Sequence, residues 1–180
     1  QKDFVPITLT ARFAMLLVAN PEKIRANSLR ELLQQLKSAP GMNYATVSAG
    51  TAHHLAMELF LVETGTDAQH IAYKGAGPAV TDVLAGNVPI MWDNLTSSLA
   101  QIRAGNFVPI GLAFPKRIPQ LPNVPTFAEL GLKGYEADTW FGLVGPANMP
   151  KDNVKKFYDV SMTVLKDPDT IKKFEENGAF

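Results

Sequence analysis

Residues 43–94, NYATVSAGTAHHLAMELFLVETGTDAQHIAYKGAGPAVTDVLAGNVPIMWDN, decide the fold of this chain. Short apolar runs of strand length alternate here with longer apolar runs of helical length, and a glycine follows each helical run. Strands are therefore expected at 43–47, 68–73 and 88–92, and helices at 52–63 and 78–85. Strands that alternate with helices of about ten residues predict right-handed βαβ units on a largely parallel sheet, so the fold class is α/β.

The same alternation continues on both sides of this stretch. Leucines at helical spacing follow Ser28, a residue that favours helix starts, and predict a helix at 28–37. One long strand or two short ones, at 4–9 and 13–19 with an interruption near 10–12, precede it. Further elements are expected, in chain order, as a helix at 95–104, a strand at 107–114, a short helix at 126–130, a strand at 135–144 and helices at 152–165 and 168–176.

Composition excludes several classes of protein. The 180 residues include 17 basic and 17 acidic side chains, so the net charge is zero and the broad positive field of a nucleic-acid-binding protein is missing. The longest apolar run, Phe13 to Ala19, is too short to span a bilayer, so no direct membrane insertion is expected. Cysteine is absent, which excludes thiolate zinc sites and cysteine nucleophiles.

Both ends of the sequence look like cuts in a longer chain. No leader with a basic start and an apolar centre precedes Gln1, so an export signal is expected to have been removed or to lie outside this sequence. The chain enters a strand pattern within a few residues of its start, and it stops on Phe180 shortly after the helix-ending Gly178. We therefore expect a piece of a longer protein.

The three strand-to-helix joints are where a ligand is expected. In open parallel sheets, ligands bind outside the carboxyl ends of the strands, and helix starts add free N–H groups and the positive end of a dipole. The first joint, Ser48-Ala49-Gly50-Thr51, can point several N–H groups and two hydroxyls at a carboxylate or another small anion. The alternative is that Ser48 or Thr51 only caps the following helix.

The second and third joints offer different groups. Tyr73-Lys74-Gly75-Ala76-Gly77-Pro78 supplies a cation and two glycines that permit a ligand to approach the backbone closely. It matches neither the dinucleotide fingerprint nor the phosphate loop, so no nucleotide cofactor is expected, and a plain glycine turn with a surface lysine is the alternative. At the third joint, Asp93 and Asn94 could bind a ligand hydroxyl or amine, or cap the helix at Leu95.

The histidines favour a structural role over catalysis or metal binding. His53 and His54 are adjacent on a helix and point to different faces, which argues against a shared metal ion. A hydrolase built from Ser48, His54 and Asp93 would lack the Gly-x-Ser-x-Gly turn around its nucleophile. We therefore expect no catalytic residue and no metal ligand, and we expect His54 to brace the first turn by a hydrogen bond.

Motifs spread along the whole chain resemble one family. Each is short, but they occur in a shared order: Asn43-Tyr44-Ala45 through Gly50-Thr51 and His54-Leu55, Tyr73-Lys74-Gly75, Asp82-Val83-Leu84-Ala85-Gly86, Trp92-Asp93-Asn94-Leu95, Lys116-Arg117, Leu121-Pro122-Asn123-Val124-Pro125-Thr126, Glu129-Leu130-Gly131 and Trp140-Phe141-Gly142-Leu143. Taken together, they resemble the solute receptors of tripartite tricarboxylate transporters, which are also called Bug receptors.

The resemblance implies a fold and a division of the chain. Such receptors are two-lobed clamshells with the type II periplasmic-binding-protein fold. The implied domains are a crossing strand and remnant of lobe 1 at 1–13, a complete ligand-binding lobe 2 at 14–130, and a crossing strand with the carboxyl-terminal helices of lobe 1 at 131–180. One lobe is then complete and the other partial, because a full receptor begins with a strand and a proline- and glycine-rich loop that this sequence lacks.

The resemblance also implies a function. Members of the family capture small carboxylates (amino acids, dicarboxylates or aromatic acids) in the bacterial periplasm for the membrane components of the transporter, without catalysis and without a cofactor. The ligand site expected on this resemblance consists of nine residues: Thr46, Ser48, Ala49, Gly50, Thr51, Tyr73, Lys74, Gly75 and Asp93. Thr46 and Ser48 depart from the family, which usually has a serine and a glycine in this turn, and His53 stands where a small residue is common. The identity of the carboxylate stays open.

Two alternative functions stay open. The same two-lobed architecture resembles the effector domains of some transcription regulators, which would need a DNA-binding helical domain elsewhere in the protein. An α/β hydrolase is the enzyme alternative. An export signal in the flanking sequence would favour the receptor, and a helix-turn-helix domain would favour the regulator.

Two expectations concern the exposure of apolar side chains. Trp92 and Trp140 lie in strand patterns, which favour core positions over a platform for a ligand. The helix at 152–165 carries an apolar stripe that is expected to be partly exposed for lack of a sheet to cover. The stripe consists of Val154, Phe157, Val160, Val164 and Leu165.

Overall fold

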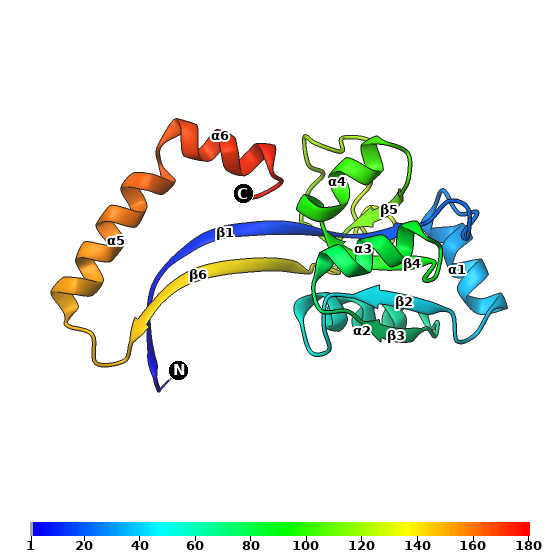
Figure 1. Ribbon diagram of the computed structural model, residues 1–180, viewed down its shortest axis with the longest axis horizontal. Coiled ribbons are helices and arrows are strands. Elements are labelled where there is room, and N and C mark those ends of the chain that lie inside the picture. Colours follow the sequence, from blue (N-terminus) through cyan, green and yellow to red (C-terminus); the bar gives the residue numbers. More distant parts are fainter. Residues whose placement is uncertain (1) are drawn as a thin grey trace. The chain divides into compact units, whose positions relative to one another are not determined.

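Residues 2–180 are described by a computed structural model, in which they form six strands and six helices (Figure 1). The elements are β1 (Phe4–Ala19), α1 (Leu29–Ser38), β2 (Asn43–Thr46), α2 (Ala52–Thr64), β3 (Gln69–Ala72), α3 (Ala76–Leu84), β4 (Ile90–Asn94), α4 (Leu95–Arg103), β5 (Val108–Leu112), β6 (Asp138–Pro146), α5 (Lys151–Leu165) and α6 (Pro168–Glu176). This order confirms the alternation of strands and helices expected for residues 43–94.

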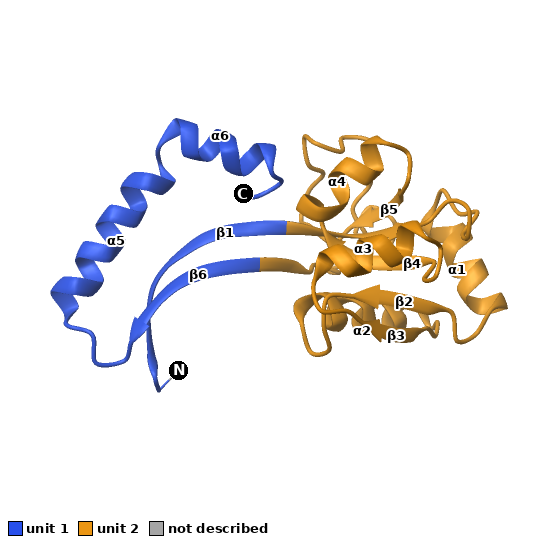
Figure 2. Cartoon of the chain, in the orientation of Figure 1, with its two compact units in different colours: residues 1–13, 140–180 blue, residues 14–139 orange. Residues whose placement is uncertain are grey.

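The chain divides into two compact units (Figure 2). Unit 1 contains the residues up to Phe13 together with 140–180, and unit 2 contains 14–139. β1 and β6 each contribute residues to both units. Residues 131–139, which the sequence assigned to the other lobe, belong to unit 2, where Tyr135 is buried and its hydroxyl donates to the carbonyl oxygen of Ala56.

The sheet has the strand order β3-β2-β4-β1-β5, and β6 pairs with β1. β2 is parallel to both of its neighbours, β3 and β4, as βαβ units require. β1 instead runs antiparallel to β4 and to β5. The parallel part of the sheet is therefore limited to the three strands that lie within residues 43–94.

Unit 2 buries an apolar core on each face of this sheet. Successive side chains of a strand point to opposite faces, and the end of β1 supplies both cores with fully buried residues. Met15, Leu17 and Ala19 face one core, and Ala14, Leu16 and Val18 face the other. α1 and α2 pack on the first core, whereas α3 and α4 pack on the second.

An aromatic cluster fills the first core. Trp92 is fully buried, as expected, and stacks on Phe127 with ring centroids 5.5 Å apart and an interplanar angle of 14°. Phe60 from α2 and Tyr135 also pack against both rings. Such ring pairs contribute about 0.5–1.5 kcal/mol each beyond the area they bury, so this cluster fixes α2 firmly against the sheet.

Several element boundaries differ from the sequence expectations. α3 begins at Ala76, ahead of Pro78, because Gly75 adopts a φ of 119° as the residue before the helix. Asp93 and Asn94 are the last residues of β4 instead of a turn. β1 is continuous through residues 10–12. These differences shift the joints by one or two residues without changing the order of elements.

No helix forms at 126–130, where a short one was expected. Thr126 Oγ1 accepts from the Glu129 N–H at 3.2 Å, and the Thr126 N–H donates to Glu129 Oε2 at 2.8 Å. These two bonds are those of a helix-capping box. They close a single turn, and Gly131 with a φ of 102° ends it before a helix can continue.

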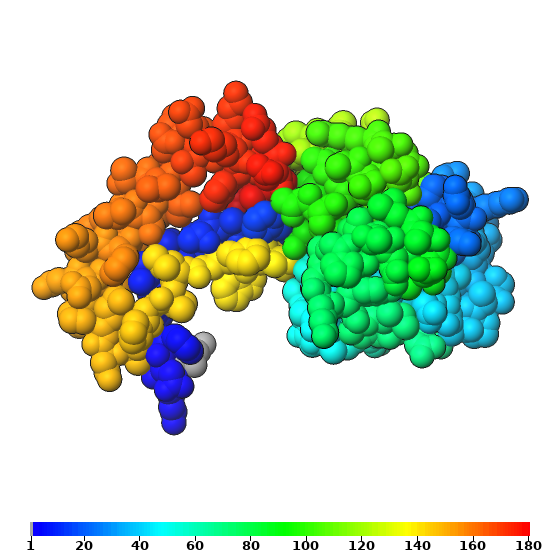
Figure 3. Space-filling model, in the orientation of Figure 1, coloured from blue at the N-terminus to red at the C-terminus, as the bar shows by residue number. Residues whose placement is uncertain are grey.

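Unit 1 leaves much of its apolar surface uncovered. No residue of α5 is buried, and Phe157, Val160 and Val164 of its apolar stripe are each more than half exposed (α5 is orange in Figure 3). The expectation that Trp140 lies in a core is wrong, because this side chain on β6 is 65% exposed. Within residues 2–180, no helix combines the length and the apolar character that a membrane span needs.

Candidate ligand-binding site at the strand ends

The parallel strands β2, β3 and β4 bring three helix starts to one edge of the sheet. β2 and β4 are neighbours, and the helices that follow them, α2 and α4, lie on opposite faces. A point where helices leave neighbouring parallel strands toward opposite faces is a topological switch point, and the crevice outside the carboxyl ends of the strands is where ligands bind in open α/β sheets. The candidate site is therefore the edge formed by the residues that follow β2 and its two parallel neighbours, β3 and β4.

The first turn, residues 47–51, is held in place by its own side chains. The hydroxyls of Thr46 and Thr51 both donate to the carbonyl oxygen of Ser48, at 3.2 and 2.9 Å. The Gly50 N–H donates to His54 Nδ1 at 3.0 Å, so the expected brace by His54 is confirmed. Thr51 is also the residue before α2, where its hydroxyl accepts from the His54 N–H at 3.5 Å. Thr51 thus caps the helix, and Ser48 does not.

Three backbone donors stay free at the start of α2. Among the described residues, the N–H groups of Thr51, Ala52 and His53 have no hydrogen-bond partner, as is normal for the first turn of a helix. The Gly50 N–H was expected from the sequence to be a donor for an anion, but it donates to His54 Nδ1 instead. The turn remains open, because no atom lies within 4 Å of the place where a Cβ on Gly50 would stand. The positive end of the α2 dipole therefore faces an accessible surface.

The second turn is joined to the first by backbone hydrogen bonds. The Tyr73 N–H donates to the Thr46 carbonyl at 3.0 Å, and the Gly75 N–H donates to the Val47 carbonyl at 3.3 Å. No side chain caps α3 after Gly75, which leaves the N–H groups of Ala76 and Gly77 without a partner in the described chain. Free donors of α2 and α3 thus follow adjacent strands.

Two candidate side chains of the second turn differ in what they offer a ligand. The Tyr73 hydroxyl donates to Asp82 Oδ2 at 2.6 Å, and burial together with this carboxylate raises the pKa of Tyr73 to about 12. The hydrogen of this hydroxyl is therefore already bonded to a residue of α3. Lys74 is exposed and has no ion-pair partner among residues 2–180, so its ammonium group stays available to an anion.

The third joint is buried, not open. Asp93 is 1% exposed, and its Oδ2 accepts from the hydroxyls of Ser97 and Ser98 at 2.6 Å each. Burial raises the pKa of Asp93, because a charged carboxylate is costly away from water. Asn94, not Asp93, precedes α4, and its Oδ1 accepts from the hydroxyl of Thr139 at 3.0 Å. Asp93 thus stabilises the start of α4 from a buried position and is not exposed to a ligand.

His53 connects the first joint to the third. His53 is 6% exposed, and neither of its ring nitrogens has a hydrogen-bond partner among the described residues. Burial lowers the pKa of His53, and the Asp93 charge opposes this shift. A neutral imidazole therefore lies behind the free donors of α2. No group of three or more histidine and acidic side chains within residues 2–180 is arranged to hold a metal ion.

Sequence reasoning missed three residues at this edge. Ser97 and Ser98 hold the Asp93 carboxyl, and His70 on β3 lies with its Nε2 2.6 Å from Thr46 Oγ1. The serines follow Asp93 at four and five residues, the spacing of one helical turn, which is the only signal in the sequence for their role. His70 is far from Thr46 along the chain, and only the parallel pairing of β2 and β3 brings them together.

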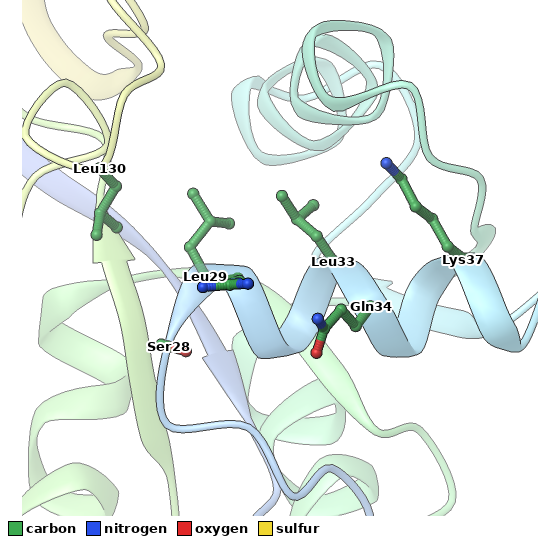
Figure 4. Close-up of a pocket in the computed structure, with 7 residues that line it drawn as sticks. Ser28, Leu29, Leu33, Gln34, Lys37 and Leu130 are labelled. Atoms are coloured by element: carbon green, nitrogen blue, oxygen red, sulfur yellow. The ribbon is translucent and has the colours of Figure 1, made fainter.

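A separate groove of about 420 Å³ lies along α1 (Figure 4). Leu29, Leu33 and Lys37 project from the same side of the helix, and Leu130 lines the groove from another segment (Figure 4). No residue that lines this groove belongs to the three joints. The groove and the strand-end site are therefore distinct surfaces of unit 2.

Comparison with known proteins identifies relatives along the whole chain. The family model described as "Tripartite tricarboxylate transporter family receptor" matches residues 1–179. The protein BugT of Bordetella pertussis is 38% identical over 146 residues, which cover 81% of this chain and 44% of BugT. A protein of Pseudomonas sp. strain P51, described as lying in the tcbD-tcbE intergenic region, is 34% identical over 98% of this chain and 53% of its own length.

Solved structures show the same fold. Rpa4515 of R. palustris, solved with adipate, is 31% identical with a TM-score of 0.92, and the match covers 99% of this chain and 60% of that one. MatC (Rpa3494) from Rhodopseudomonas palustris, solved with bound malate, is 26% identical with a TM-score of 0.89, over 98% of this chain and 60% of that one. The fold is thus that of periplasmic binding proteins. The chain spans about half the length of the curated relatives it matches.

Proposed function

The chain belongs to the tripartite tricarboxylate transporter receptor family, and on that premise we propose that it is part of a periplasmic solute receptor that holds a small carboxylate at the strand ends of unit 2. Units 1 and 2 would correspond to the partial and the complete lobe of such a receptor. The receptor would deliver its ligand to the membrane components of the transporter and would catalyse no reaction.

The observation that carries this proposal is the set of free N–H groups of Thr51, Ala52 and His53 on a braced, open turn. A carboxylate accepts two or three such bonds, and the dipole of α2 favours its negative charge. Four side-chain hydrogen bonds already fix the turn, so little ordering free energy is lost when a ligand binds.

We propose a dicarboxylate as the ligand class. The relatives Rpa4515 and MatC carry adipate and malate, which are both dicarboxylates. The second carboxylate would find the exposed ammonium group of Lys74 and the free N–H groups of Ala76 and Gly77 at the start of α3. The engaged hydroxyl of Tyr73 and the buried carboxyl of Asp93 would shape the site without donating to the anion.

Replacing Ala52 by proline tests this proposal, because it removes a backbone donor without disturbing the helix. Proline fits the first position of a helix, where the N–H has no helical partner, and Pro168 already occupies that position in α6. Thr51 has φ −77° and ψ 166°, the extended conformation that a following proline requires. Ala52 itself is exposed, so the ring has room.

We expect Ala52→Pro to weaken the binding of malate or adipate to the full-length protein by about 1.5–3 kcal/mol, measured by calorimetry, with an unchanged melting temperature. Lys151→Pro is the matched control, since Lys151 is the exposed first residue of α5 and follows a residue with ψ 136°. This control should bind the diacid like the wild type. Equal affinity of the Ala52→Pro variant and the wild type would show that the α2 donors do not bind the carboxylate.

A further inference from the structure

Two stacked imidazoles lie beneath the first turn. His54 on α2 and His70 on β3 have ring centroids 4.1 Å apart and an interplanar angle of 15°. Tyr44 on β2 also stacks on His70, with ring centroids 5.1 Å apart and an interplanar angle of 24°. The proposed function does not use these rings, although both contact the turn directly through hydrogen bonds to Gly50 and Thr46.

The hydrogen bonds determine which nitrogens carry protons. Thr46 has one hydroxyl hydrogen, which it donates to the Ser48 carbonyl at 3.2 Å. The His70 tautomer that is consistent with this bond donates its Nε2–H to Thr46 Oγ1 at 2.6 Å. His54 accepts the Gly50 N–H on Nδ1 and must therefore be unprotonated there. Its Nε2–H then faces Glu58 Oε1 at 3.6 Å, and the same oxygen accepts the Tyr44 hydroxyl at 2.6 Å.

The stack can hold one positive charge, and the carboxylate beside its rings, Glu58, lies next to His54. Two imidazolium rings 4.1 Å apart would repel each other, and the pKa of His70 is lowered by burial and by His54, against an opposing effect of Glu58. Tyr44 stays neutral, because burial and Glu58 raise its pKa. His53, the neighbour on α2, faces Asp93 instead. Glu58, whose Oε1 lies 3.6 Å from His54 Nε2, is therefore the carboxylate placed to pair with an imidazolium at His54.

A proton on Nδ1 of His54 would turn an acceptor into a donor. The Gly50 N–H would lose its partner and become a further donor for an anion at the same turn. The imidazolium would also add a positive charge next to the start of α2. Both changes favour a bound carboxylate over an empty site.

We propose that His54 is a positioning residue of the carboxylate site, which takes up a proton when the ligand binds and then releases the Gly50 N–H to it. This inference rests on the carboxylate-binding function proposed above. Because the bound state favours protonated His54, affinity is highest at acidic pH and falls as the pH rises through the range in which histidines titrate, about pH 5 to 8. For one linked proton, the fall is at most about tenfold per pH unit.

Calorimetry on the full-length protein tests the inference. Malate binding is measured at pH 7, where malate is fully ionised, in PIPES, with a small enthalpy of ionisation, and in imidazole, with a large one. The difference between the two observed enthalpies, divided by the difference between the ionisation enthalpies of the two buffers, gives the number of protons taken up. We expect uptake of a measurable fraction of one proton per malate, and a dissociation constant that rises from pH 6 to pH 8.

Two variants locate the proton. Asparagine places an oxygen where His54 has Nδ1, so His54→Asn keeps an acceptor for the Gly50 N–H and removes the titrating group. It should bind malate without proton uptake and with a flat pH profile. Glutamine places a donor where His70 has Nε2, so His70→Gln keeps the bond to Thr46 and should still take up a proton through His54.

The outcomes separate this inference from the proposed function. Malate binding without proton uptake in the wild type would overturn the role of His54 and leave the carboxylate site standing. Proton uptake that persists in His54→Asn, or that disappears in His70→Gln, would assign the proton to another group and overturn it as well. Absence of binding of any small carboxylate would refute the proposed function itself. If His54→Asn does not fold, ¹⁵N spectra of the wild-type histidines decide: His54 should change from the Nε2–H form to imidazolium when malate is added, and an unchanged signal would contradict the inference.

Discussion

Two amphipathic helices, one in each unit, differ in whether their apolar face is buried. In unit 2, α1 buries Leu29, Leu32 and Leu36 against the sheet. In unit 1, α5 also presents an apolar stripe, but no residue of α5 is buried. The difference shows that helical periodicity predicts which face of a helix needs a partner, and that only the neighbouring elements decide whether the face is covered.

The largest expected difference between the units is in the effect of removing a phenylalanine ring. Phe60 on α2 is fully buried among Trp92, Phe127 and Tyr135, whereas Phe157 on α5 is 51% exposed. We expect Phe60→Ala to lower the free energy of unfolding by about 3–5 kcal/mol. Phe157→Ala should lower it by no more than about 0.5 kcal/mol. Denaturant unfolding of both variants measures this, and equal losses would show that the α5 stripe is covered in solution.

A smaller difference is expected between the effects on stability of replacing two carboxyl groups, one in each unit. Burial raises the pKa of Asp93 above its ordinary value of 3.8, so the folded protein favours the protonated carboxyl more than the unfolded chain does. The protonated group therefore contributes stability at acidic pH, and this contribution is lost as the pH rises through the raised pKa. Relative to the wild type, Asp93→Asn should gain stability as the pH increases. Thermal unfolding from pH 3 to pH 8 measures the trend, and a constant difference between the two proteins would contradict it.

Asp159 in unit 1 should give the smallest effect. It forms an exposed ion pair with Lys155 at 2.6 Å, one helical turn away on α5. Such surface pairs contribute about 0.3–0.5 kcal/mol, and salt screens them. We expect Asp159→Asn to change the free energy of unfolding by no more than this at low salt and not at all at 1 M salt. A loss above 1 kcal/mol would mean that α5 is held in a less exposed setting.

The sequence predicted the parts of the fold that depend on local pattern. The alternation within residues 43–94, the cap at Ser28 and the brace by His54 all follow from spacing and from the chemistry of helix starts. Trp140 could not be placed, because the same strand pattern that puts Trp92 in a core gives no information about whether a second layer exists. The start of α3 was misjudged because the φ of 119° at Gly75 allows the helix to begin before its proline.

The sequence predicted that the strand-to-helix joints lie at one edge of the sheet, but not which of their donors stay free. Parallel strands place the joints at one edge, and this follows from the alternation of elements. The availability of each donor does not follow, since the Gly50 N–H is lost to His54 and the Tyr73 hydroxyl to Asp82 through contacts that only the folded chain defines. The role of His70 depends on the pairing of β2 with β3, which brings it to Thr46 from a distant part of the sequence.

The most direct test of the account is a titration of the ¹⁵N-labelled full-length protein with malate, followed through its backbone amide resonances. The account predicts large, saturable shifts for Thr51, Ala52 and His53, with further shifts at Ala76 and Gly77, and no change along the α1 groove at Arg30 and Lys37. Shifts confined to the α1 groove, with the amides of α2 unchanged at saturation, would contradict the central claim that the strand-end turns bind the carboxylate.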